Sequence, residues 1–103
     1  MVATYFLFRK DVMICKRANE NCKGNSITRG YGYLKGTSSM DGSGIDVYVG
    51  TGENRVNAII CIVDLLKRDS EIKILIGCSE EEKSVLYKMH NETQFMKGIL
   101  IRR

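Results

Sequence analysis

The chain has 103 residues, of which 44% are hydrophobic and 27% charged, and its net charge is +4. This length supports a single domain over residues 1–103 and leaves no room for a second core. No apolar run approaches the ~20 residues that cross a bilayer. The first apolar stretch, residues 2–8, precedes the nearest basic residues, which is the reverse of a signal peptide. We therefore expect a cytoplasmic protein with no membrane partner.

The four cysteines and the single histidine show no metal-binding pattern. Cys15, Cys22, Cys61 and Cys78 include no C-x-x-C pair, and structural zinc sites are built from such clusters. In a reducing cytoplasm these residues are expected to be free thiols. The sequence therefore predicts no metal ion and no other cofactor.

The first half of the chain is predicted to be mostly β-structure. Residues 2–17 are rich in aliphatic and aromatic side chains, which favours one long strand or a strand pair. Residues 18–29 are polar and predict a loop. Residues 30–36 and 45–49 predict two more strands, and the polar, glycine-containing segment 37–44 predicts the turn between them.

The second half is predicted to alternate helices and strands. One set of apolar residues recurs at helical spacing and predicts a helix over 56–66; its members are Val56, Ile59, Ile60, Val63 and Leu66. Residues 72–76 predict a buried strand. Ser79 precedes three glutamates and predicts the start of a second helix, and residues 94–103 predict a last strand. The expected fold class is α/β, with a three-stranded antiparallel meander followed by α-β-α-β in one mixed sheet.

Four short motifs follow one another along residues 12–85. They are Asn19-Glu-Asn-Cys-Lys-Gly-Asn25, Gly30-Tyr31-Gly32, the segment from Thr51 to Ala58, and the segment from Ile74 to Ser79. Together they resemble the active-site framework of the ribonuclease H-like family. That family hydrolyses phosphodiester bonds with two Mg²⁺ ions held by carboxylates. The resemblance implies a ribonuclease H-like fold for this chain.

The positions that match the family's carboxylates carry Asn19, Asn57 and Cys78. Amides and thiols are poor Mg²⁺ ligands, so the resemblance implies a module without the family's catalysis. The acids nearby in sequence, Glu20, Glu53 and Glu80, leave open an active metal-dependent nuclease with displaced ligands. Asp64 is expected on an exposed flank of the predicted helix.

Basic residues surround this framework and suggest an anionic partner. They are Lys16, Arg17, Lys23, Arg29 and Arg55, and Tyr31 could stack on a base. The first hypothesis is therefore binding of RNA or of an RNA/DNA hybrid through the former active-site cleft. A solvated basic face and an ordinary strand tyrosine are the simpler explanations of the same residues.

A second hypothesis is a protein-interaction module, such as a small viral or mobile-element decoy or inhibitor, or an assembly subunit. The short chain, the open sheet edges and the glutamates at 80–82 favour this alternative. His90 has no catalytic partner in the sequence and is expected to be a surface or capping residue. The segment Asp41-Gly-Ser-Gly44 is explained by a hairpin turn without invoking a phosphate loop.

Overall fold

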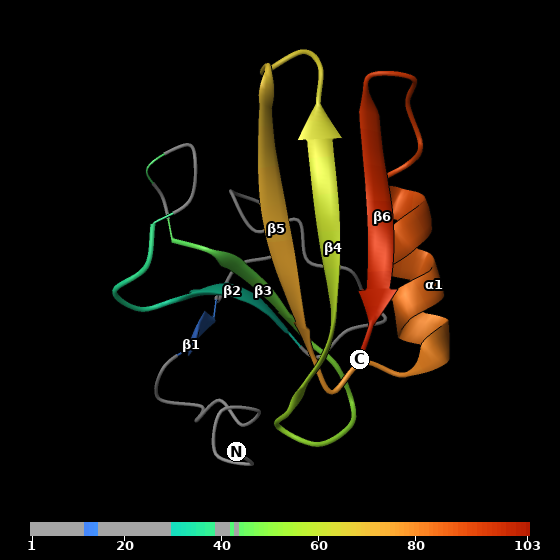
Figure 1. Ribbon diagram of the computed structural model, residues 1–103. Helices are drawn as coiled ribbons and strands as arrows, with labels where there is room; N and C mark the ends of the chain where they lie inside the picture. The colour runs from blue at the N-terminus through green and yellow to red at the C-terminus, as the bar shows by residue number, and fades with distance from the viewer. Residues whose placement is uncertain (1–11, 15–29, 39–41, 43) are drawn as a thin grey trace.

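The computed structural model describes residues 12–14, 30–38, 42 and 44–103. The elements in these residues are β1 (Val12–Ile14), β2 (Gly30–Leu34), β3 (Asp46–Val49), β4 (Val56–Asp64), β5 (Asp69–Ile76), α1 (Glu80–Met89) and β6 (Met96–Arg102). The strands form one sheet in the order β1-β2-β3-β5-β4-β6, and α1 lies against one face of it (Figure 1). The prediction of an α/β chain with one mixed sheet is confirmed.

The predicted antiparallel meander is present as β1, β2 and β3. β1 pairs with β2, and β2 pairs with β3, both antiparallel. β2 and β3 fall within the segments expected to be strands at 30–36 and 45–49. Of the long strand expected over 2–17, only β1 lies within the described residues, and the loop expected at 18–29 lies outside them.

The segment predicted as the first helix is the strand β4, and this prediction was wrong. Burial in β4 alternates from one residue to the next: Ala58, Ile60 and Ile62 are buried, whereas Ile59 and Cys61 are half-buried and Val63 is exposed. The helical spacing arose because apolar residues occupy both faces of the strand. Most of them are β-branched, which restricts χ1 and favours an extended backbone.

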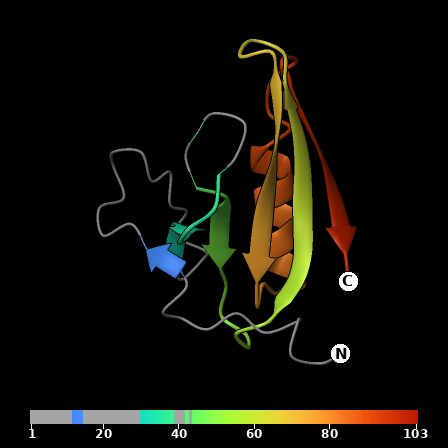
Figure 2. The ribbon, with the colours of Figure 1, turned by 60° about the vertical axis from the view of Figure 1, so that its left-hand side comes forward.

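β4 and β5 form a long antiparallel hairpin. The Oδ1 atom of Asp64 accepts hydrogen bonds from the backbone N–H groups of Leu66 at 3.0 Å and Lys67 at 3.1 Å, and this Asx-type turn reverses the chain. The predicted strand at 72–76 is confirmed within β5, but it is not buried on both faces, since Ile72 is exposed and Ile74 half-buried. The return of β5 places it between β4 and β3, antiparallel to the first and parallel to the second. Figure 2 shows the hairpin edge-on, with α1 behind it.

The second predicted helix, α1, is confirmed together with its start. Ser79 is the N-cap and accepts a hydrogen bond from the N–H of Glu82, whose carboxylate accepts one in return. The helix covers the core, which consists of Tyr48, Ala58, Ile60, Ile62, Leu75, Cys78 and Leu86. The prediction that His90 is a capping residue is confirmed, since it is the C-cap of α1. It is not a surface residue: it is buried, and its Nε2 lies 3.2 Å from the hydroxyl of Tyr48. The final predicted strand is confirmed as β6, which pairs with β4.

Within the described part of the chain, α1 is the sole helix, and it is too short and too polar to span a bilayer.

Candidate functional site

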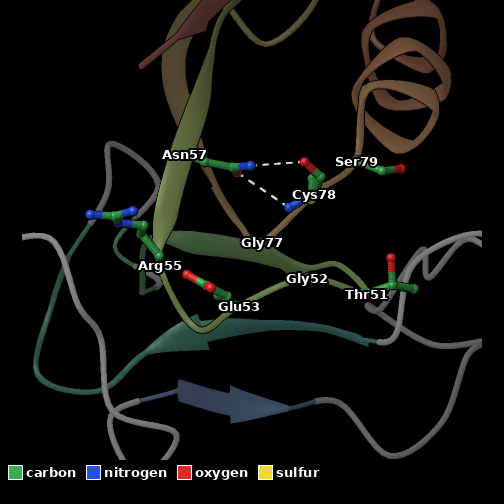
Figure 3. Close-up of a pocket in the computed structure, with 8 residues that line it drawn as sticks. All are labelled: Thr51, Gly52, Glu53, Arg55, Asn57, Gly77, Cys78 and Ser79. Carbon is green, nitrogen blue, oxygen red and sulfur yellow. Dashed lines mark hydrogen bonds between the residues drawn. The ribbon is translucent and has the colours of Figure 1, made fainter.

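A pocket of about 340 Å³ opens at the carboxyl ends of β3 and β5. These two strands are parallel neighbours, so the loops that follow them meet at the same edge of the sheet. Ligands in α/β proteins bind preferentially at such edges. The residues that line the pocket are Thr51, Gly52, Glu53, Arg55, Asn57, Gly77, Cys78 and Ser79 (Figure 3).

Glycines allow the two loops, 50–55 and 77–79, to approach each other closely. The N–H of Gly52 donates to the carbonyl of Gly77 at 2.7 Å, and the N–H of Gly77 donates to the carbonyl of Arg55 at 2.8 Å. Gly77 has a φ of 59°, and a Cβ at this position would collide with the carbonyl of Glu53. Gly77 therefore provides both the left-handed backbone and the space that the contact requires.

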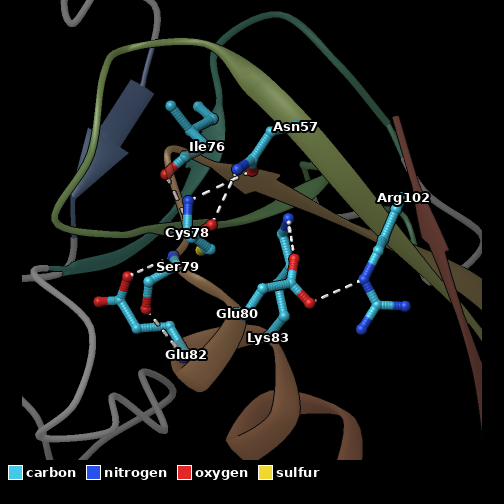
Figure 4. Close-up of polar contacts among 8 residues, drawn as sticks. All are labelled: Asn57, Ile76, Cys78, Ser79, Glu80, Glu82, Lys83 and Arg102. Atoms are coloured by element: carbon cyan, nitrogen blue, oxygen red, sulfur yellow. Dashed lines mark hydrogen bonds and ion pairs between the residues drawn. The ribbon is translucent and has the colours of Figure 1, made fainter.

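Asn57 fastens β4 to the 77–79 loop. Its Nδ2 donates to the carbonyl of Cys78 at 2.8 Å, and its Oδ1 accepts from the N–H of Cys78 at 3.2 Å (Figures 3 and 4). The register of β4 against β5 shifts between Val56 and Ala58, so Asn57 occupies the irregular position. Its side chain thus pairs with backbone groups just beyond the end of β5.

Glu82 ties the N-terminus of α1 to the 50–55 loop. Its Oε1 accepts hydrogen bonds from the N–H of Ser79 at 2.7 Å, the N–H of Thr51 at 3.3 Å and the hydroxyl of Thr51 at 3.2 Å. Burial alone would raise the pKa of Glu82, but the hydrogen bonds from Ser79 and Thr51 outweigh it and lower the pKa. The other carboxylate oxygen, Oε2, is buried and has no hydrogen-bond partner.

The thiol of Cys78 is a core group and not a reactive one. Burial raises its pKa to about 12, and the nearby charge of Glu82 acts in the same direction. The sulfur points to the backbone carbonyls of Tyr48 and Ile76. Cys78 therefore contributes its backbone to the pocket wall, while its side chain stays protonated at neutral pH.

The structure brings together four of the residues that the sequence singled out, and one of them, Glu53, is a candidate displaced metal ligand. Asn57, Cys78 and Arg55 all line the pocket, although Asn57 lies on a strand and not on the helix that the ribonuclease H-like resemblance implied. Tyr31 is not in the lining: its ring packs on that of Tyr48 with centroids 4.7 Å apart. The remaining candidate residues, Lys16, Arg17, Asn19, Lys23 and Arg29, lie outside the described residues.

Tyr31 is half-buried among charged groups. The ammonium of Lys73 lies 5.9 Å from its ring centroid, and Lys73 forms ion pairs with Asp46 and, at 2.9 Å, with Glu71. Burial raises the pKa of Tyr31 to about 12, with the carboxylate of Asp46 adding to the shift and Lys73 opposing it.

The acids considered as displaced metal ligands do not gather at the pocket. Glu53 lines it, but Glu80 pairs with Lys83 and Arg102 (Figure 4). Asp64 is buried at the opposite end of β4 and holds the hairpin turn, so the expectation of an exposed flank was wrong. Glu20 lies outside the described residues. Among the residues that the structure describes, no three His, Cys, Asp or Glu side chains are grouped so that they could hold a metal ion.

Four lining residues, Thr51, Gly52, Gly77 and Ser79, were not recognised as site residues from the sequence. Their signal is a glycine directly after each of two apolar strands, Gly50 after β3 and Gly77 after β5. That pattern indicates a ligand-binding edge only if the two strands are parallel neighbours, and the strand order was not known from the sequence.

A family model identifies the protein family to which the chain belongs. Residues 12–101 match the family model described as Inorganic Pyrophosphatase. The chain belongs to the inorganic pyrophosphatase family. The matched range includes both loops of the pocket. No curated protein and no solved structure is significantly similar to the chain.

Membership of the inorganic pyrophosphatase family corrects the resemblance to ribonuclease H, which was wrong. The motifs that carried it were short, and the helix that should follow Thr51 is the strand β4. Nucleic-acid binding as a description of the chain depended on that resemblance and is no longer supported.

Proposed function

We propose that this chain binds inorganic pyrophosphate in the pocket between the 50–55 and 77–79 loops and hydrolyses its phosphoanhydride bond. The observation that carries the proposal is the position of the pocket, at the carboxyl ends of two parallel strands and beside the N-terminus of α1. Phosphate groups favour such positions in α/β proteins. Membership of the inorganic pyrophosphatase family supports the choice of substrate.

Side chains, more than backbone amides, would contact the anion. The N–H groups of Gly52 and Gly77 bond to backbone carbonyls, and that of Cys78 bonds to Asn57. Arg55 lies on one side of the pocket, and the hydroxyl residues Thr51 and Ser79 lie on the other (Figure 3). A guanidinium forms charge-assisted hydrogen bonds with phosphate oxygens. The hydroxyl of Ser79 accepts from the N–H of Glu82 and can donate its proton to the other phosphoryl group, whereas the hydroxyl of Thr51 donates to Glu82.

The donor set of the pocket does not fit a resident two-metal centre. Glu53 is the one carboxylate among the eight lining residues. Both amide atoms of Asn57 are engaged by Cys78. A single carboxylate does suit a Mg²⁺ ion that is already bound to the substrate, because Mg²⁺ commonly combines one or two carboxylates with substrate phosphates and water. We therefore take magnesium pyrophosphate as the substrate and Glu53 as its contact.

The reaction that follows is attack of water on one phosphorus atom and departure of the other phosphate. Phosphoryl transfer is accelerated mainly by positioning and by neutralising charge on the phosphoryl oxygens. Arg55 would supply positive charge, and the two loops would hold the substrate against the rigid ends of β3 and β5. The products are two phosphate ions.

The test is release of phosphate from magnesium pyrophosphate by the purified chain. We expect Arg55→Ala to reduce kcat/KM by about tenfold or more, since a hydrogen bond to a charged group contributes about 1.5–3 kcal/mol. Glu53→Gln should also reduce it. Matched controls are Lys67→Ala and Glu92→Gln, which change exposed charges outside the pocket.

Binding of magnesium imidodiphosphate, which is not hydrolysed, separates binding from catalysis. Binding that weakens in Arg55→Ala supports the pocket even if turnover is slow. If the chain releases no phosphate above the blank and does not bind the analogue in calorimetry, the proposal is wrong.

A further inference from the structure

The sheet face that points away from α1 carries an exposed apolar surface on β4, β5 and β6. Its side chains follow the alternation of the three strands, opposite to the core residues Ala58, Ile60 and Ile62. We call this surface the open face, and its residues are Ile59, Cys61, Val63, Ile72, Ile74, Ile99 and Ile101. Among these, Ile99 is 67% exposed, Val63 and Ile101 are 49% exposed, and Ile72 is 48% exposed.

The open face is continuous because its residues are in register. Ile101 pairs with Ile59, which pairs with Ile74, and these form one apolar row across the three strands. The next row consists of Ile99, Cys61 and Ile72. No described helix or strand covers these rows, and strands that are apolar on both faces are normally buried on both. A contiguous apolar surface of this kind marks an interaction site.

The dimensions of the open face fit one helix. Three neighbouring strands span about 10 Å, and the six-residue distance from Lys97 to Arg103 is about 20 Å. A helix has a diameter of about 10–12 Å, and about 14 residues are about 21 Å long. A stable interface between two globular chains buries about 800 Å² of each partner. The area of the open face is much smaller than that. α1 covers the opposite face of the same strands (Figures 1 and 2).

The charge around the open face is positive. Lys97 is exposed at the start of β6 and shares a row with Val63 and Ser70. Arg103 follows the other end of β6, next to Asn57. None of the outward positions of the three strands, which alternate along residues 57–63, 70–76 and 97–103, is Asp or Glu. Two copies of this face would bring like charges together, whereas a partner with acidic residues would complement them.

We infer that the open face binds an amphipathic helix of a partner protein, whose apolar side is flanked by Asp or Glu residues. The apolar rows would receive the apolar side of the helix, and Lys97 would pair with an acidic flank. This role is separate from the phosphate pocket, which lies at the strand ends and shares no residue with the open face.

The test uses three designed 14-residue peptides and fluorescence anisotropy. One has leucines at helical spacing with glutamate flanks, the second has lysines in place of the glutamates, and the third is a scrambled version of the first. We expect the glutamate peptide to bind at least about tenfold more tightly than the other two. Equal affinities for the three peptides would overturn the inference.

Substitutions then locate the binding surface. Ile99→Asp should weaken binding of the glutamate peptide by about tenfold or more, because it places a like charge in the apolar row. Leu66→Asp is the matched control, since Leu66 is an exposed apolar residue in the hairpin turn and outside the open face. Lys97→Glu should weaken binding of the glutamate peptide and strengthen binding of the lysine peptide. Circular dichroism checks that each variant is folded, and Ile99→Asp should leave phosphate release unchanged.

Two other occupants are distinguished by the same variants. Dimerisation in sedimentation equilibrium that Ile99→Asp abolishes would assign the face to a second copy and overturn the inference. Co-sedimentation with phosphatidylserine vesicles that depends on Ile99 would assign it to a membrane surface and would also overturn it. The inference is supported if the protein is a monomer, does not co-sediment with the vesicles and binds the glutamate peptide.

Discussion

The side-chain amide of Asn57 pairs with the backbone of Cys78 through two hydrogen bonds, one donated and one accepted. This is the exchange that two strand residues make in a β-ladder, but one partner here is a side chain. It occurs where the β4–β5 register shifts. The amide therefore holds the 77–79 loop in place where backbone pairing stops.

Asn57→Ala should destabilise the protein by about 1–3 kcal/mol, because it leaves the N–H and carbonyl of Cys78 without this partner. Asn57→Asp should be at least as damaging, since it replaces a donor with a carboxylate oxygen facing a carbonyl. Urea unfolding measures both, and Asn54→Ala in the 50–55 loop that precedes β4 is the exposed control. Equal stabilities of Asn57→Ala and Asn54→Ala would show that the pairing contributes nothing.

Gly77→Ala should disrupt the contact between the two pocket loops. Gly77 has a positive φ, and its added Cβ would also collide with the carbonyl of Glu53. Gly36→Ala is a matched control, because Gly36 has a φ of 71° but nothing within 4 Å of the added Cβ. The free energy of unfolding of the control should fall by about 1–2 kcal/mol, because alanine is strained in the left-handed backbone. That of Gly77→Ala should fall further. Similar losses in the two variants would show that the loops can separate without cost.

The stabilising effect of the Glu82 charge should depend on pH. Because the pKa of Glu82 is lowered in the folded state from its ordinary value of 4.5, the stabilisation is present above the unfolded pKa and is lost as the pH falls through the folded pKa. Glu82→Gln keeps an acceptor for the capping box but removes the charge. The free energy of unfolding of the native protein should therefore exceed that of the variant at pH 7, and the difference should shrink toward pH 3.

Glu80→Gln is the comparison for this titration. The pKa of Glu80 is also lowered, by hydrogen bonds from Lys83 and Arg102, but the side chain is exposed, so solvent screens its contribution. We expect the pH-dependent loss of the free energy of unfolding to be smaller in Glu80→Gln than in Glu82→Gln. The opposite result would show that the charge of Glu82 does not stabilise the fold as described.

Tyr48→Phe should cost about 1–2 kcal/mol through loss of the contact between its hydroxyl and Nε2 of His90. Both residues are buried, and His90 ends α1, so the loss should appear as earlier unfolding of the helix. Thermal unfolding followed by circular dichroism measures it. Tyr33→Phe, at an exposed position on β2, should leave the melting temperature unchanged.

The sequence correctly predicted those elements whose local sequence pattern agrees with the surroundings they have in the fold. Ser79 followed by three glutamates predicted the start of α1, and the capping hydrogen bonds explain why. The error at 56–66 has the opposite origin. A central strand covered by α1 on one side and apolar on the other contains apolar residues at nearly every position, so helical and strand spacing are both satisfied. The choice between them depends on pairing with β5 and β6, which are distant in sequence.

The site was predictable only in part for the same reason. Asn57, Cys78 and Arg55 were recognised as neighbours, and they do meet at the pocket. The reason given for their convergence was wrong, because a few short motifs in order do not define a family. The hydroxyl and glycine residues were missed because their roles depend on β3 and β5 being parallel neighbours.

The insertion of β5 between β3 and β4 has a consequence for the order of folding. The β4–β5 hairpin is local in sequence and can form early, whereas the pairing of β5 with β3 spans a longer loop and must wait for the two parts to meet. The pocket does not exist until that docking step is complete, since each of its walls follows one of the two strands. The proposed pyrophosphate ligand would therefore bind only the fully assembled sheet. Above its Kd, it should raise the melting temperature of the whole molecule with the logarithm of its concentration.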